Sequence, residues 1–199
     1  MKSVLISIRP EWCEKIASGE KTVEVRKTRP KLEPPFKVYV YCTKGPLYLN
    51  SHNGYVYLEE LDRLGFRGPG LYKRLNPGVI GEFVCYRIDY WNHQIHDDDT
   101  ITLERASELS CVSEDELVEY ADLGHFYAWH ISDLKIYEKP MALYEFYHKC
   151  EKMACEWCEH LKYQQVNSDE RDYDCEYLNG NIPLSRPPQS WCYVEEVTP

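Results

Sequence analysis

The sequence lacks any long apolar run. None of its apolar segments approaches the roughly 20 residues that a helix needs to cross a membrane, so we expect no membrane-spanning segment. The first apolar stretch is short and is stopped by Arg9 and Pro10. This pattern predicts a first β-strand and not a signal peptide. We therefore expect a soluble, cytoplasmic protein.

Positive charge is also scarce, with 23 Lys and Arg against 33 Asp and Glu and a net charge of -10. Residues 1–50 nevertheless hold 10 Lys and Arg against 5 Asp and Glu, whereas residues 51–199 hold 13 against 28. The acidic remainder repels phosphate at long range, which disfavours broad, non-specific duplex binding. A local basic cluster can still receive one phosphate, a base or a short single strand. A solvated basic turn is the competing interpretation.

No internal repeat or low-complexity tract is present. The 43% apolar content and 17 tyrosines are sufficient for a packed core, and the length favours one sizeable domain with or without a small appendage. Short strands mixed with two helices predict an α+β fold, a small mixed β-barrel over residues 1–145. Residues 146–199 form a polar, cysteine-rich extension.

Local patterns place the elements of this barrel. A first helix begins at Pro10 and ends at Gly19, a residue that tolerates positive φ. Ser113 and Glu116 form a capping box that begins a second helix over residues 114–122. Residues 44–78 read as a long connection with helical turns at 58–64, and residues 96–100 as a solvated loop with metal binding as the alternative. The predicted strands are residues 4–8, 21–26, 36–43, 79–91 and 126–138.

The second predicted strand carries charge on one face. Val23 and Val25 face one side, and Glu24 and Arg26 face the other, close to Lys21 and the end of the first helix. A nucleoside needs hydrogen-bond donors and acceptors at its polar edge and an aromatic surface for stacking. Lys21 and Arg26 supply donors and Glu24 supplies an acceptor.

Aromatic residues near this strand complete the candidate site. Trp12, Tyr127 and Trp129 are available for stacking, although the last two equally suit an ordinary barrel core. The candidate ligand is a polar, phosphate-bearing molecule such as RNA, a nucleotide or a nucleoside. The candidate ligand-binding residues are Arg9, Trp12, Lys21, Glu24, Arg26, Thr43, Lys44 and Trp129.

The segment LISIRPEWCEKIASGEKTVEVRK contains a Gly-x-Lys-x-x-Glu-x-Arg core formed by Gly19, Lys21, Glu24 and Arg26. It resembles the ASCH domain, a branch of the PUA-like fold. The later segments GVIGEFVCYRI and YAWHISDLKIYEKP occupy the places of the middle and closing strands of that domain. The resemblance spans residues 1–145. It implies a partly closed β-barrel with a cleft beside the first helix that binds RNA, nucleotides or modified nucleosides.

Some ASCH proteins are enzymes, including amidohydrolases that deacylate N4-acetylcytidine and reported ribonucleases. In those amidohydrolases a Lys and a nucleophilic Thr lie three residues apart, and the matching positions here are Lys21 and Glu24. The chain therefore departs from that pattern. If it is an enzyme, Lys21 and Glu24 are its candidate catalytic residues, with Glu24 as a general base. A protein-interaction module with an acidic surface is a third alternative.

Cysteine is abundant, and five of the nine residues follow the pattern C-x4-C-x2-C-x16-C-x16-C near the end of the chain. The C-x2-C spacing suits a tetrahedral zinc site, and so small a polar extension needs a metal or docking on the barrel to become ordered. Free thiols and redox chemistry are the alternatives. The predicted ligands of a structural zinc ion are Cys155, Cys158, Cys175 and Cys192, with Cys150 as a substitute.

Overall fold

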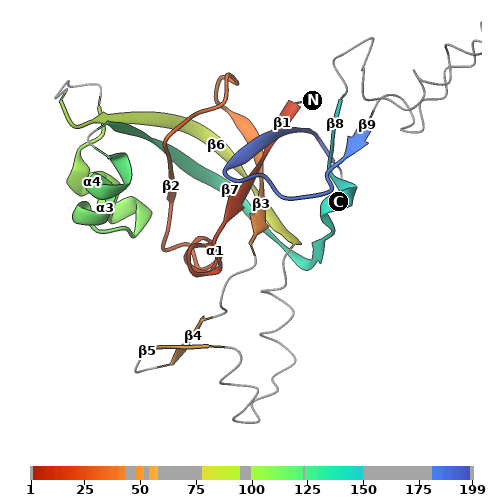
Figure 1. Ribbon diagram of the computed structural model, residues 1–199, viewed down its shortest axis with the longest axis horizontal. Helices are drawn as coiled ribbons and strands as arrows, with labels where there is room; N and C mark the ends of the chain where they lie inside the picture. The colour runs from red at the N-terminus through yellow and green to blue at the C-terminus, as the bar shows by residue number, and fades with distance from the viewer. Residues whose placement is uncertain are drawn as a thin grey trace, which may run out of the picture.

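The structure is a computed structural model of the 199-residue chain, and it describes residues 2–43, 48–51, 54–57, 78–94, 100–122, 124–149 and 181–197. These residues form an α+β fold around one mixed sheet (Figure 1). Its strands are β1 (Lys2–Ile8), β2 (Val23–Arg26), β3 (Phe36–Cys42), β6 (Gly78–Asn92), β7 (His125–Met141) and β10 (Trp191–Glu195). The α-helices of the described ranges are α1 (Pro10–Ala17), α3 (Leu103–Ser110) and α4 (Glu114–Ala121).

The six strands have the order β10-β1-β3-β6-β7-β2. β1 and β3 run parallel, and the other neighbours run antiparallel. Two short antiparallel strand pairs and a 3-10 turn complete the described elements. They are β4 (Tyr48–Ser51) with β5 (Gly54–Tyr57), β8 (Tyr147–Lys149) with β9 (Asn181–Pro183), and η1 (Leu143–Glu145).

The core consists of three apolar clusters, and two of them flank the site. One contains Ile8, Cys13 and Trp129 and lies between α1 and the sheet. A second joins α3 and α4 to β2, β6 and β7, where the rings of Trp91 and Phe126 stack with centroids 4.9 Å apart. Figure 1 shows α3 and α4 together at one end of the β6–β7 ribbon. Val23 and Val25 of β2 pack into the second cluster, and Glu24 and Arg26 lie on the other face, because side chains alternate along a strand.

The partly closed barrel predicted from the sequence is not what the structure contains. Among the described residues, no ladder joins the outermost strands β2 and β10, so the six-stranded sheet stays open. Side chains connect these two edges in place of a ladder. Trp191 Nε1 donates to Thr28 Oγ1 at 3.0 Å, and Tyr193 Oη accepts from the Lys31 N–H at 2.7 Å. β2 is only four residues long and ends at Arg26, before its backbone could reach β10.

The local signals in the sequence identify several element boundaries correctly. α1 begins at Pro10, and Gly19 adopts a φ of 81° just after the helix. Both bonds of the predicted capping box are present, since Ser113 Oγ accepts from Glu116 N–H and Glu116 Oε2 accepts from Ser113 N–H. The first bond satisfies one of the N–H groups that a helix start leaves unpaired.

The predicted extension contributes to the main sheet. β10 pairs with β1, and Phe146 is fully buried against Tyr39 with ring centroids 4.9 Å apart. The sequence analysis missed both β10 and α3. The helical turns predicted at 58–64 and most of the loop at 96–100 lie outside the described residues. Within those residues, no helix is long and apolar enough to span a membrane.

Candidate functional site

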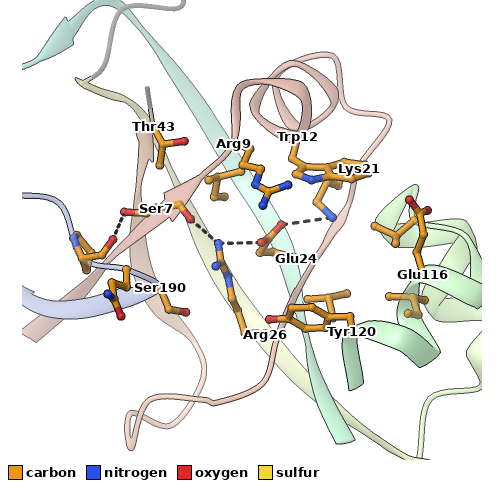
Figure 2. Close-up of a pocket in the computed structure, with 16 residues that line it drawn as sticks. Ser7, Arg9, Trp12, Lys21, Glu24, Arg26, Thr43, Glu116, Tyr120 and Ser190 are labelled. Atoms are coloured by element: carbon orange, nitrogen blue, oxygen red, sulfur yellow. Dashed lines mark hydrogen bonds and ion pairs between the residues drawn. The ribbon is translucent and has the colours of Figure 1, made fainter. Parts of the chain in front are cut away.

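A cavity of about 660 Å³ lies between α1, β2 and α4 (Figure 2). Its walls come from the end of β1 with the start of α1, from residues 21–26, from the region of α4, and from the segment 188–190. Folding brings these distant segments together around one space. Of the predicted ligand-binding residues, six line it: Arg9, Trp12, Lys21, Glu24, Arg26 and Thr43.

Glu24 lies between two cations on the wall of this cavity. Its Oε1 is 3.0 Å from Arg26 Nη2, and its Oε2 is 3.3 Å from Lys21 Nζ. The relation between Glu24 and Arg26 follows from the alternation along β2, whose Val23 and Val25 pack against the cluster with α3 and α4. The structure therefore brings together the three charged side chains that the sequence analysis selected.

Backbone carbonyl groups hold both cations in place. Lys21 Nζ donates to the carbonyl of Ser110 at 2.8 Å, at the end of α3, where the helix dipole favours a positive charge. Arg26 Nη2 donates to the carbonyl of Ser7 at 2.7 Å. The side chains of Lys21 and Glu24 are only 2% and 8% exposed. The charged groups are thus fixed by the protein before any ligand arrives.

The electrostatic balance of this cluster favours an anionic ligand. Two cations face one carboxylate, which leaves an excess of positive charge when Lys21 is protonated. Burial lowers the pKa of the Lys21 ammonium group, and the Glu24 carboxylate opposes that shift. Glu24 Oε2 is buried with the Lys21 ammonium group as its ion-pair partner at 3.3 Å, whereas Arg26 Nε is buried without a hydrogen-bond partner among the described residues. The Nε–H group of Arg26 is therefore a donor without an acceptor.

Two aromatic residues line the cavity. The Trp12 ring lies with its centroid 5.2 Å from Lys21 Nζ and 5.1 Å from Lys15 Nζ, within the range of cation–π attraction. Tyr120, on α4, is 39% exposed, and Lys27 Nζ is 5.5 Å from its ring centroid. Figure 2 shows Trp12 and Tyr120 on opposite sides of Glu24. The cavity thus presents flat apolar surfaces beside its charged group.

The sequence analysis missed the walls that come from α4 and from the end of the chain. Glu116 and Tyr120 belong to a helix that the capping box located, but no local pattern indicates which element that helix faces. Ser7 connects β1 to the wall formed by residues 188–190, because its N–H donates to Ser190 O at 2.9 Å and its Oγ donates to Pro188 O at 2.7 Å. Arg9 lies at the rim with its side chain 78% exposed.

A family model for the ASCH domain matches residues 6–165, more than half of the chain. The chain belongs to the ASCH domain family. Members of this family have a PUA-like fold and are generally associated with RNA binding. No curated protein sequence matches the chain.

A solved structure agrees with the ASCH assignment at the level of the fold. The crystal structure of ASCH from Zymomonas mobilis is 17% identical, with a TM-score of 0.52 over 98% of this chain and 88% of that chain. A crystal structure of a serine-to-alanine mutant of the Zymomonas mobilis protein is also 17% identical, with a TM-score of 0.49 over 98% of this chain and 89% of that chain. At this identity the similarity concerns the fold alone.

The predicted ligand-binding residue Trp129 and the stacking candidate Tyr127 do not line the cavity. Trp129 is fully buried and packs against Phe36 and Trp191, with ring centroids 5.9 and 6.1 Å away. It belongs to the core because the same face of β7 is covered by α1 and β10. Tyr127 is partly buried on that face and lies outside the cavity wall. Lys44 lies outside the described residues.

Of the predicted zinc ligands, only Cys192 lies within the described residues. This residue pairs with Leu5 across β1 and β10, and burial raises the pKa of its thiol to about 11. Such an environment favours the neutral thiol over the thiolate that binds zinc. Cys150, Cys155, Cys158 and Cys175 lie outside the described residues. Within the described ranges, no three His, Cys, Asp or Glu side chains form a group able to hold a metal.

Zinc binding by the cysteine-rich extension stays a prediction. Elemental analysis of the purified protein is expected to find about one zinc ion per chain. Cys155→Ser should remove it, because this residue belongs to the C-x2-C pair, whereas Cys13→Ser on the buried face of α1 should retain it. Metal-free wild-type protein would exclude the site.

Proposed function

We propose that this ASCH protein binds RNA and that one nucleotide or nucleoside unit enters the cavity beside Lys21, Glu24 and Arg26. The observation that carries this proposal is the buried group of two cations and one carboxylate on the wall of a cavity of about 660 Å³. Small-molecule sites commonly have volumes of about 300–1,000 Å³. The cavity is therefore large enough for a mononucleotide.

The chemistry of the cavity matches the parts of a nucleotide. The Glu24 carboxylate and the Arg26 guanidinium group line the cavity and supply an acceptor and a donor for the polar edge of a base. Trp12 and Tyr120 offer aromatic surface to its flat face. Exposed Arg9 at the rim adds positive charge where a phosphate can remain solvated. Together these groups can contact the base and the phosphate of one nucleotide.

The overall charge favours a short or single-stranded ligand. The chain carries a net charge of -10, and its excess of cations is confined to residues 1–50. A long duplex would bring many phosphates close to the acidic remainder, whereas one or a few nucleotides need only the local basic region.

Calorimetric titration tests this proposal directly. Nucleosides, mononucleotides and short single-stranded RNAs should be titrated into the wild-type protein, with duplex DNA of equal length as the comparison. We expect saturable binding of a mononucleotide and of single-stranded RNA, with much weaker binding of the duplex. Absence of binding to every nucleoside, nucleotide and RNA would reject the proposal.

A hydrolase that uses the same cavity is the second candidate. The lowered pKa of Lys21 and the adjacent Glu24 carboxylate favour it, since both groups line the cavity and can exchange protons with a bound substrate. Glu24 occupies the place of the amidohydrolase threonine, so the hydrolase proposed here uses Glu24 as a general base instead of that nucleophile. Turnover of N4-acetylcytidine or RNA by the wild-type protein would favour the enzyme. If the wild-type protein neither bound nor turned over these ligands, that result would favour a protein-interaction module.

A further inference from the structure

A cluster of three aromatic rings lies next to the cavity and is not part of its wall. Tyr90, His125 and Tyr127 have ring centroids 5.4 Å apart in each of the three pairs. All three side chains are partly exposed. They belong to β6 and β7 at the end of the ribbon that carries α3 and α4 (Figure 1).

The ladder of the sheet places this cluster beside Arg26. Arg26 lies opposite Tyr127 in the β2–β7 pair, and Tyr127 lies opposite Tyr90 in the β6–β7 pair. Directly opposed residues of antiparallel strands share a face, with their Cβ atoms about 4.5–5.5 Å apart. His125 is on the same face as Tyr127, two residues away along β7. The rings therefore extend the row that begins with Arg26 at the cavity.

The two faces of the ribbon differ in how far their aromatic side chains are exposed. On the opposite face, Trp91 and Phe126 are 7% and 0% exposed and pack against α3 and α4. The three rings keep part of their surface open to solvent, and Asn92 Nδ2 donates to Tyr90 Oη at 2.8 Å, which holds the Tyr90 hydroxyl group. Partly exposed, fixed rings suit stacking of an unpaired base, which tolerates any base because each has a π-face.

Two exposed cationic residues come after Arg26 in the sequence. After Arg26 the chain leaves β2, and the exposed Lys27 and Arg29 come next in sequence. Cations beside stacking rings are the combination with which proteins follow a single strand of nucleic acid. A duplex offers no unstacked bases to such rings. The occupant that fits this surface is therefore single-stranded RNA.

We propose that Tyr90, His125 and Tyr127 form a second subsite, which stacks an unpaired base of single-stranded RNA next to the nucleotide bound in the cavity. This inference rests on the proposed function, because it adds a neighbouring nucleotide to the same ligand. The second subsite makes the chain bind an RNA strand more tightly than a mononucleotide.

The test compares 5′-AMP with a single-stranded adenylate hexanucleotide by calorimetry in wild-type and variant proteins. Tyr90→Ala should weaken hexanucleotide binding about tenfold to a hundredfold and leave AMP binding unchanged. Tyr90→Phe retains the ring and should bind both ligands as the wild type does. Tyr144→Ala, which removes the same side chain from a position that is 72% exposed on η1, is the matched control and should have no effect.

The outcomes separate this inference from the proposed function. Wild-type binding of both ligands with an unchanged hexanucleotide affinity in Tyr90→Ala would overturn the subsite alone. An equal loss for AMP and the hexanucleotide would also overturn it, because the ring would then act through the fold. Wild-type protein that binds neither ligand would overturn the subsite and the proposed function together.

Discussion

Glu24→Ala is expected to lower the free energy of unfolding by about 3–5 kcal/mol, because removing one partner of a buried ion pair leaves uncompensated charge. Lys21 and Arg26 would then lie inside the protein without the carboxylate that each now approaches at 3.3 and 3.0 Å. The carbonyl groups of Ser110 and Ser7 hold these cations in place and provide no negative charge to replace it. Urea denaturation followed by circular dichroism measures the change.

Glu14→Ala is the matched control for this loss. Glu14 is an exposed residue of α1, so its substitution removes the same charged group with an expected effect within about 0.5 kcal/mol. If Glu24→Ala and Glu14→Ala had the same unfolding midpoint, Glu24 would not be needed to compensate the two cations.

Arg26→Ala is expected to weaken binding of a mononucleotide or RNA by about tenfold to a hundredfold, since a charge-assisted hydrogen bond is worth about 1.5–3 kcal/mol. Arg26 lines the cavity, so its guanidinium group can donate to a ligand while Nη2 stays bonded to Ser7 O. Glu24 would retain Lys21 as its counterion in this variant. We therefore expect Arg26→Ala to weaken the free energy of binding by more than it lowers the free energy of unfolding. Calorimetry at fixed salt concentration measures it.

Arg105→Ala separates a direct contact from a change in overall charge. Arg105 is half exposed on α3, forms an ion pair with Glu108 and does not line the cavity. Its removal changes the net charge by the same amount as Arg26→Ala. Equal dissociation constants for the wild type and Arg26→Ala would remove Arg26 from the binding site. Equal losses in both variants would indicate long-range attraction only.

Much of the local structure around the site was predictable because it depends on neighbouring residues. Gly19 ends the first helix through its own backbone freedom, and the Ser113–Glu116 capping box begins α4 through bonds within one turn. The alternation along β2 placed Glu24 and Arg26 on one face, and their ion pair follows from that register. Such signals act over a few residues, so they can be read without knowing the rest of the fold.

Predictions that depended on contacts between distant elements were less successful. Trp129 has the aromatic surface expected of a stacking residue, but burial between α1 and the C-terminal strand makes it part of the core. A partly closed barrel was expected, whereas the six-stranded sheet of the described residues is open and side-chain bonds from Trp191 and Tyr193 connect its edges. No pattern near residue 191 indicates that this segment pairs with β1 at the other end of the chain.

The sequence by itself determined the charged Lys21–Glu24–Arg26 group, the limits of α1 and α4, and the resemblance to the ASCH domain over the first part of the chain. The tertiary structure alone decided that this group lines a cavity, that α4 and residues 188–190 complete its walls, and that Tyr90, His125 and Tyr127 adjoin Arg26. The physical reason is the distance along the sequence over which each kind of interaction acts. Strand alternation and helix capping depend on adjacent residues, whereas a cavity depends on which apolar faces pack together over the whole chain.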